Sequence, residues 1–223
     1  MEVIKRNRSL AFLRTKQYDA ALTDTGFPTF SEEPSEKAFF RAAEALYHLA
    51  RYDECRQVLE QVCKIFPANK EARAALTRAQ RRCGEGSTGQ FDFKLLQAEA
   101  KKHQPPHLDH ATYVGPLEVR KVQGKGRGLF VTKPVQAGHL LLCEQAFSHA
   151  HVDEEGESNA DIKLLMNVET NKGFMGGQAD LLRMITQKLF KNPSLTSAFT
   201  GLYHGDYKAV DAKFADGEPI VDT

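Results

Sequence analysis

The sequence predicts an α+β protein that begins with helical hairpins and continues into a small β-structure interrupted by a helical insert. A Tyr-Asp pair recurs at Tyr18 and Tyr52, 34 positions apart, which is a period typical of stacked helical hairpins. Farther along the chain, three glycines alternate in the stretch Gly124-Lys-Gly-Arg-Gly128, with strand-like runs on both sides. The repeat period predicts the helical part, and the glycine stretch predicts a turn between two strands.

These patterns divide the chain into three regions. We assign 1–83 to helical repeats with a capping helix, 84–113 to a linker, and 114–223 to a β-containing region with strands within 117–145 and a helical insert at about 160–207. At 223 residues, with 41% hydrophobic and 26% charged residues, the composition is that of a globular protein.

The clearest helical hairpin runs from 38 to 65. Its apolar residues recur at helical spacing on both sides of a break at Ala50-Arg51, and they are Ala38, Ala42, Ala45, Leu46, Leu49, Cys55, Val58, Leu59, Val62 and Ile65. Asn69 is a suitable N-cap for a third helix over roughly 70–82, with Gly84 as its C-terminal stop. The first hairpin is degenerate, because Gly26-Phe27-Pro28 cuts its second helix short. The whole pattern resembles tetratricopeptide repeats, which implies protein partners.

Three residues of the repeats form a candidate peptide-binding site. Asn7 and Arg41 hold equivalent repeat positions, and Lys37 precedes Arg41 by one helical turn. This set resembles the Asn/Lys/Arg arrangement with which some repeat proteins hold C-terminal carboxylates, because cationic side chains pair with carboxylates. The alternative, which we favour, is that Lys37 and Arg41 only solvate an exposed face. We therefore expect weak or no binding to an acidic C-terminal peptide.

The linker begins with Gly84-Glu-Gly-Ser-Thr-Gly89, which predicts a flexible joint. His103, His107 and His110, with Asp109, have spacings that a metal site would allow. Ordinary loop histidines are commoner, so we predict no metal. The chain has four cysteines without a CxxC pair, which predicts reduced thiols and a location in the cytoplasm or nucleus.

Charge and hydropathy weigh against two classes of protein. The 30 Lys and Arg residues nearly balance 29 Asp and Glu residues, whereas a nucleic-acid binder usually carries a basic excess. No apolar run approaches the roughly 20 residues of a membrane helix, and the N-terminal residues lack the apolar core of a signal peptide. We therefore expect neither nucleic-acid nor membrane binding.

The glycine stretch and its surroundings resemble the opening of a SET domain. The resemblance rests on the glycines, on the Gly128-Leu-Phe130 strand, and on the Ala137-Gly138 turn that leads into Leu140-Leu-Leu142. The stretch 108–120 is similar to the lead-in of proteins that join tetratricopeptide repeats to a SET domain. Together they resemble the SET-and-MYND-like (SMYD-like) protein lysine methyltransferases. This implies a partial SET β-fold, S-adenosylmethionine as cofactor and a protein lysine as substrate.

Carried over by position, the resemblance implies that Lys125, Gly126 and Arg127 line the cofactor pocket. A glycine lets the backbone approach a ligand closely, and a cation suits the carboxylate of the cofactor. The alternative is a tight hairpin whose basic residues are solvated. Because of the flanking strands and the repeats, we favour the interpretation that this loop derives from a cofactor-binding loop.

The catalytic elements implied by the resemblance are missing. The chain has no Asn-His pair, and Tyr203 and Tyr207 lie in the insert rather than in the context of the catalytic tyrosine. We therefore assign no catalytic residue and expect an incomplete, inactive SET domain, or alternatively a repeat scaffold with a non-catalytic SET remnant. The late strands that would pair with the early ones are then absent, which leaves apolar edges at 129–131 and 140–142 and predicts poor solubility or oligomerisation.

Overall fold

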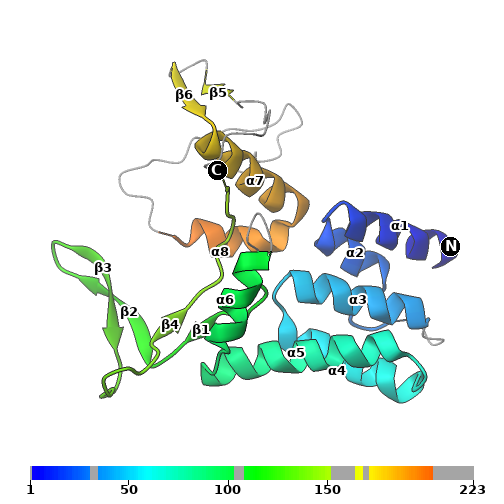
Figure 1. The fold of residues 1–223 in the computed structure, drawn as a ribbon. Coiled ribbons are helices and arrows are strands. Elements are labelled where there is room, and N and C mark those ends of the chain that lie inside the picture. Colours follow the sequence, from blue (N-terminus) through cyan, green and yellow to red (C-terminus); the bar gives the residue numbers. More distant parts are fainter. Residues whose placement is uncertain (1, 31–34, 103–107, 152–163, 168–170, 203–223) are drawn as a thin grey trace. The chain divides into compact units, whose positions relative to one another are not determined.

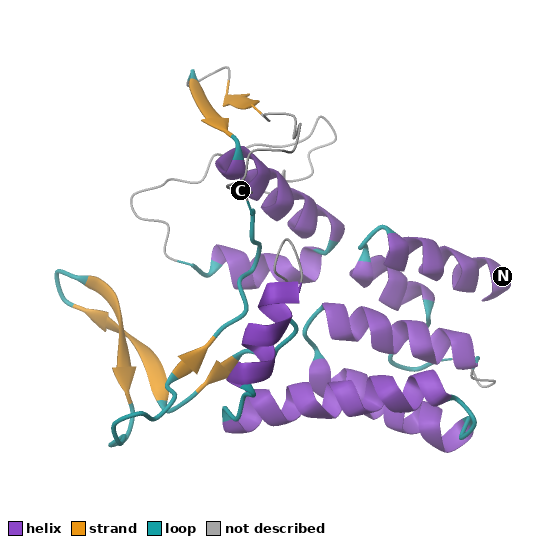
Figure 2. Ribbon diagram, in the orientation of Figure 1, coloured by secondary structure: helices purple, strands orange, loops and turns teal. Residues whose placement is uncertain are grey.

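The computed structural model describes residues 2–30, 35–102, 108–151, 164–167 and 171–202 (Figure 1). Helices predominate, and the described strands form three separate two-stranded ladders (Figure 2). The chain divides into two compact units, one made of Met1–Phe27 with Phe147–Thr223 and the other of Pro28–Ala146. Among the helices of the described ranges, none has the length and apolar character needed to cross a membrane.

The unit Pro28–Ala146 is built on a helical hairpin followed by two further helices. Its helices are α3 (Glu36–His48), α4 (Tyr52–Ile65), α5 (Lys70–Thr88) and α6 (Phe93–Lys102). The predicted break is confirmed, because Ala50 has a positive φ of 58° and the amide of Arg51 donates to the carbonyl oxygen of Leu46 at 2.9 Å. The side chains of Leu46, Leu59 and Val62 are fully buried between these helices, as their helical spacing predicts.

Helix α5 begins where the sequence predicts and ends later. The side chain of Asn69 accepts a hydrogen bond from the amide of Ala72 at 2.8 Å, which confirms the predicted N-cap. The predicted stop at Gly84 and the predicted flexible joint at 84–89 are wrong, because the helix continues to Thr88 and ends at Gly89. A glycine inside a helix costs only about 1 kcal/mol, and ion pairs from Arg81 and Arg82 to Glu85 stabilise this last stretch.

The strands of this unit form two ladders. Strand β1 (Tyr113–Val114) pairs with β4 (Leu142–Cys143), and β2 (Leu117–Val122) pairs antiparallel with β3 (Gly126–Val131). The β2–β3 turn is closed by the amide of Lys125, which donates to the carbonyl oxygen of Val122 at 3.1 Å. Gly124 and Gly126 have φ values of 72° and 81°, a conformation that only glycine adopts readily. The predicted turn between two strands is therefore confirmed.

The other unit combines the N-terminal hairpin with the C-terminal part of the chain. Its elements are α1 (Glu2–Arg14), α2 (Tyr18–Asp24), β5 (Leu164–Asn167), β6 (Lys172–Met175), α7 (Gly177–Lys191), the 3-10 helix η1 (Pro193–Leu195) and α8 (Thr196–Thr200). The short α2 confirms that the chain is interrupted near Gly26. The prediction of a helical insert over about 160–207 is wrong at Leu164–Asn167 and Lys172–Met175, because these two stretches pair as antiparallel strands. Asn171, at a φ of 52°, supplies the turn before β6.

Candidate functional site

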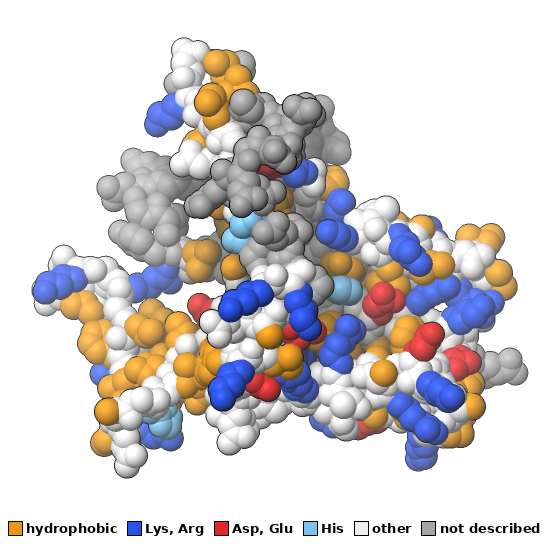
Figure 3. All heavy atoms as spheres, viewed as in Figure 1, with side chains coloured by type: hydrophobic (Ala, Val, Ile, Leu, Met, Phe, Trp, Pro, Cys, Tyr) orange, Lys and Arg blue, Asp and Glu red, His pale blue; other side chains and the backbone are white. Residues whose placement is uncertain are grey.

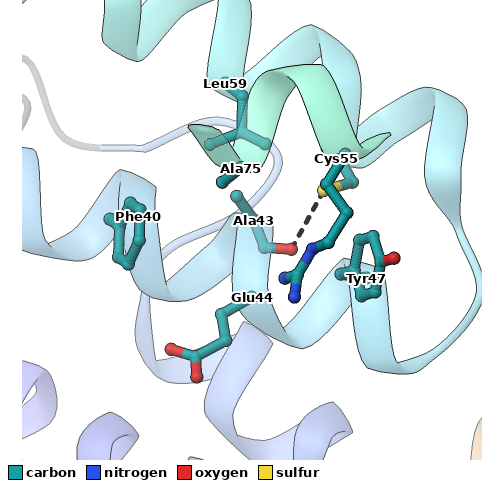
Figure 4. A pocket seen from close by; sticks show the side chains of 8 residues that line it. Phe40, Ala43, Glu44, Tyr47, Cys55, Leu59 and Ala75 are labelled. Carbon is teal, nitrogen blue, oxygen red and sulfur yellow. Dashed lines mark hydrogen bonds between the residues drawn. The ribbon is translucent and has the colours of Figure 1, made fainter. Parts of the chain in front are cut away.

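A hollow of about 100 Å³ lies between α3, α4 and α5, and Figure 4 shows it from close by. Three helices supply its walls, through Phe40, Ala43, Glu44 and Tyr47 on α3, Cys55 and Leu59 on α4, and Ala75 and Arg78 on α5. The α3 residues share one face, because residues three, four and seven positions apart lie on the same side of a helix. Alanines at two of the lining positions leave the space that larger side chains would fill.

The thiol in this hollow is not a nucleophile. The Sγ of Cys55 donates to the carbonyl oxygen of Ala43 at 3.2 Å, the bond drawn in Figure 4. Burial raises the pKa of Cys55 to about 12. Because the thiolate is the reactive form of cysteine, this thiol is inert near neutral pH. Cys55 therefore packs the wall of the hollow and supplies no thiolate to it near neutral pH.

The wall of the hollow at Tyr47 combines an aromatic ring with a cation. The guanidinium of Arg78 lies over the Tyr47 ring, 4.0 Å from its centroid, which is a favourable cation–π geometry. The ring of Tyr52 packs edge-on against Tyr47, with centroids 5.2 Å apart. Glu44 lines the same hollow from α3. The site thus offers both signs of charge beside aromatic surface, which suits a polypeptide segment.

Tyr47 also connects the hollow to the segment that leads into β1. Its hydroxyl donates to the carboxylate of Asp109, at 2.7 Å from each oxygen. Burial, and then this carboxylate, raise the pKa of Tyr47. Two residues farther along this segment, Ala111 donates its amide to Glu85 Oε2 at 3.0 Å. Side chains of α3 and α5 therefore both hold the segment 109–111.

The buried Arg82 lies close to the same two acidic residues, Glu85 and Asp109. The side chain of Arg82 is 3% exposed, and its Nη2 lies 3.0 Å from Glu85 Oε1. Its Nη1 lies 3.7 Å from Asp109 Oδ1, and within the described part of the chain neither Nη1 nor Nε has a hydrogen-bond partner. Asp109 and Glu85 nevertheless place two carboxylates close to this cation, as a buried charge requires.

The structure places the three predicted peptide-binding residues on two helices. Lys37 and Arg41 lie one turn apart on α3, where Lys37 is exposed and Arg41 half-buried. Asn7 lies on α1, in the other compact unit, and is exposed. The structure therefore brings together two of the three residues, and the complete carboxylate clamp stays a prediction.

The predicted cofactor residues lie at the tip of the β2–β3 hairpin. Lys125, Gly126 and Arg127 are all exposed. A Cβ added to Gly126 would meet no atom within 4 Å, so the positive φ of this residue, rather than a close neighbour, calls for glycine here. The geometry agrees with the tight hairpin that the sequence left open as an alternative, and the assignment to a cofactor pocket stays a prediction.

The predicted histidine cluster is only partly within the described residues. His103 and His107 lie outside them. The ring of His110 is buried, with Nδ1 2.9 Å from the carbonyl oxygen of Ala111 and the ring of Phe91 packed against it edge-on. Among the described residues, no group of three or more metal-ligating side chains lies together. His110 therefore has a packing role in the segment that Tyr47 and Glu85 hold.

Comparisons with known proteins relate the chain to two others. It is 40% identical over 217 residues to a Gibberella zeae protein named "Methyltransferase", in a match that covers 97% of this chain and 30% of that protein. Over 76 residues it is 33% identical to the Drosophila melanogaster "DNA polymerase interacting tetratricopeptide repeat-containing, protein of 47 kDa", covering 34% of this chain and 19% of that protein. No family model matches the chain, and no solved structure matches it significantly.

The two matches cover very different shares of this chain. The methyltransferase-named homologue aligns with nearly the whole chain, although the chain spans less than a third of that relative's length. The second relative matches only about a third of the chain. A relationship to a methyltransferase-named protein therefore extends over nearly all of the chain, and the likeness to a repeat-containing protein is limited to one part.

Proposed function

We propose that this chain is the repeat-bearing part of an S-adenosylmethionine-dependent protein lysine methyltransferase of the tetratricopeptide–SET kind. The observation that carries the proposal is the 40% identity to a methyltransferase-named protein over 97% of the chain. The α3–α4 hairpin with the following α5, and the glycine hairpin with two positive φ values, support it.

The two parts of the unit Pro28–Ala146 would have different tasks. The hollow between α3, α4 and α5 would bind a segment of a protein partner, which presents the lysine to be methylated. The tip of the β2–β3 hairpin would contribute Lys125 and Arg127 to the carboxylate of S-adenosylmethionine. This cofactor supplies the methyl group as a sulfonium. No residue of the chain is assigned to the transfer step, so we propose that the chain alone is inactive.

A calorimetric titration with S-adenosylmethionine tests the cofactor part of this proposal. We expect measurable binding that weakens by about tenfold in Lys125→Ala and in Arg127→Ala, because each removes one cation. The matched control is Lys133→Ala, which removes an exposed cation just beyond β3 and should leave the affinity unchanged. Absence of binding to the wild-type chain would refute the proposed contacts of Lys125 and Arg127 with the cofactor.

A repeat scaffold without any cofactor is the second candidate, and the hollow is the observation that favours it. The probe is an acidic peptide with a free C-terminal carboxylate, followed by fluorescence anisotropy. We expect weak binding that Arg78→Ala abolishes, since Arg78 lines the hollow. Lys70→Ala, which removes an exposed cation at the start of α5, is the control. Peptide binding together with no binding of S-adenosylmethionine would favour the scaffold.

A further inference from the structure

The carboxylate of Asp109 lies between two donors, the hydroxyl of Tyr47 and the guanidinium of Arg82. It accepts from the hydroxyl at 2.7 Å from each of its oxygens. Its Oδ1 is 3.7 Å from Nη1 of Arg82, which is beyond hydrogen-bonding distance. Asp109 therefore makes one of the two contacts within its reach and leaves the other open.

Arg82 is the side chain that this arrangement leaves incompletely paired. It is 3% exposed, and its Nη2 lies 3.0 Å from Glu85 Oε1, whereas Nη1 and Nε find no acceptor among the described residues. A buried N–H group without an acceptor is unfavourable. Guanidinium–carboxylate hydrogen bonds are about 2.7–2.9 Å long, so a movement of the Asp109 carboxylate by roughly 1 Å would supply an acceptor for Nη1. The carboxylate thus has a second position close to the one it occupies.

The hydroxyl that holds Asp109 in its present position responds to charge in the hollow. The guanidinium of Arg78 lies 4.0 Å from the centroid of the Tyr47 ring. Burial, and then the Asp109 carboxylate, raise the pKa of Tyr47, and the charge of Arg78 acts against them. A cation that makes a phenol more acidic also makes its O–H group a stronger hydrogen-bond donor. Arg78 therefore strengthens the bond from Tyr47 to Asp109.

The position of Asp109 decides which helices hold the segment 109–111. With Asp109 on Tyr47, the segment is held by α3 and also by α5, where Glu85 accepts from the amide of Ala111 at 3.0 Å. With Asp109 on Arg82, both contacts come from α5, and the connection to α3 is lost. Strand β1 begins at Tyr113, so a change in this segment reaches the β1–β4 ladder.

We propose that Asp109 is a relay between the hollow and the segment that leads into β1, with Tyr47 and Arg82 as its two positions. A carboxylate bound in the hollow pairs with Arg78, which is exposed on α5, and withdraws its charge from the Tyr47 ring. The hydroxyl becomes a weaker donor, Asp109 moves to Arg82, and the segment 109–111 loses its connection to α3. The relay rests on the proposed function for its ligand, the acidic peptide, and adds a consequence of peptide binding for the start of the β-structure.

Hydrogen exchange of the Ala111 amide, followed by NMR in the full 223-residue chain, reports on the relay without any ligand. Arg78→Ala removes the cation from the Tyr47 ring, and we expect the exchange rate to rise at least about fivefold. Arg73→Ala is the matched control, because it removes another exposed cation of α5. Figure 3 shows Lys and Arg side chains spread among Asp and Glu side chains over the helices of this unit, so a general effect of losing a cation would appear in both variants. The Ala72 amide, hydrogen-bonded at the start of the same helix, should exchange as in the wild type.

Tyr47→Phe shows whether Arg78 acts through the hydroxyl. This variant should raise the exchange rate of Ala111 by itself, and the addition of Arg78→Ala to it should change the rate by less than about twofold. Asp109→Asn shows whether Arg82 is the second position, because the amide still accepts from Tyr47 but has no charge that attracts it to Arg82. In that background Arg78→Ala should likewise change the rate by less than about twofold.

Four results would overturn the relay. They are an unchanged exchange rate of Ala111 in Arg78→Ala, an equal rise in Arg73→Ala, a rise of the same size at Ala72, and a full effect of Arg78→Ala in either double variant. The last result would show that Arg78 acts on the segment by a route that does not include the hydroxyl and the carboxylate.

The acidic peptide with a free C-terminal carboxylate adds the ligand. At a saturating concentration it should raise the exchange rate of Ala111 in the wild type, as Arg78→Ala does, and should have no such effect in Asp109→Asn. Binding without a change at Ala111 would refute the relay and leave the proposed peptide site standing. Absence of binding would refute the peptide site, while the variants without ligand would still decide the relay.

Discussion

The hydroxyl of Tyr47 on α3 donates to both carboxylate oxygens of Asp109, at 2.7 Å from each. The two residues are 62 positions apart. Tyr47 forms one wall of the hollow, and Asp109 lies four residues before β1. A single side chain therefore connects the candidate binding site to the segment that begins the β-structure.

Removal of this hydroxyl should loosen the segment 109–111. In Tyr47→Phe, Asp109 loses its hydroxyl donor, and we expect a loss of about 1–2 kcal/mol in the free energy of unfolding, measured with urea. Tyr52→Phe is the control, because it removes a hydroxyl from the neighbouring ring and leaves the bond to Asp109 in place. Equal losses in the two variants would show that the bond to Asp109 contributes nothing of its own.

Alkaline pH should destabilise the unit that contains the hollow. Burial raises the pKa of Cys55 from 9.0 to about 12 and that of Tyr52 from 10.0 to about 12, and it also raises the pKa of Tyr47. Above pH 9 the unfolded chain loses these protons first, so it binds fewer protons than the folded chain. The free energy of unfolding is therefore unaffected by these groups below about pH 9 and falls above it, by about 1.4 kcal/mol per pH unit for each group.

Urea unfolding between pH 8 and pH 11 measures this dependence. Cys55→Ala should flatten the curve between pH 9 and 10, and Tyr52→Phe should flatten it above pH 10. A free energy of unfolding that stays constant over the whole range would contradict the burial of all three groups.

Gly84 inside α5 and Gly89 directly after it should respond in opposite ways to alanine. Gly84 is helical, and a Cβ there would meet no atom within 4 Å, so Gly84→Ala should stabilise the protein by about 0.5–1 kcal/mol. Gly89 has a φ of 70°, and a Cβ there would lie 2.6 Å from the Tyr113 ring. Gly89→Ala should therefore destabilise by at least about 1 kcal/mol.

Each of these two variants is the control for the other, because both add one methyl group near the C-terminal end of α5. Thermal unfolding gives the sign of each change. A loss of stability in Gly84→Ala would mean that the helix ends there after all, as the sequence predicts.

Asn192 should be needed for the start of α2. Its Oδ1 accepts from the amide of Tyr18 at 2.7 Å, and its Nδ2 donates to the carbonyl oxygen of Lys16 at 3.0 Å. The residue is 1% exposed, so Asn192→Ala should cost about 2 kcal/mol and increase hydrogen exchange at the first amides of α2.

Ser194→Ala serves for comparison, because it removes only the exposed bond from Ser194 Oγ to Asp19. We expect it to cost no more than about 0.5 kcal/mol. Unchanged exchange of the Tyr18 amide in Asn192→Ala would exclude the capping role.

The α3–α4 hairpin could be predicted from the sequence because the residues that specify it lie close together in the chain. Leu46, Leu59 and Val62 recur at helical spacing, and all three are fully buried. Asn69 likewise marks the start of α5 by its side-chain chemistry alone. The turn at Gly124 and Gly126 follows from the conformational freedom of glycine in the same way.

The continuation of α5 past Gly84 could not be predicted from local signals. Glu85 stabilises this stretch by pairing with Arg82 and by accepting from the amide of Ala111, which is 26 positions away. The contact between Tyr47 and Asp109 is equally remote in sequence. The hollow depends on such packing between helices, so the sequence indicated its helices and missed the site. The cofactor and clamp residues rest on resemblance, and both remain predictions.

The hydrogen bonds from Tyr18 and Asp19 to Asn192 span 174 and 173 positions of the chain. During synthesis, the first amides of α2 therefore gain this acceptor only after residue 192 of the 223 has been made. Contacts of such long range slow folding, because a large loop must close before they form. In a nascent chain stalled before residue 192, the α1–α2 hairpin should therefore be cleaved readily by proteases. Helices α4 and α5, on either side of Asn69, can already pack against each other at that stage.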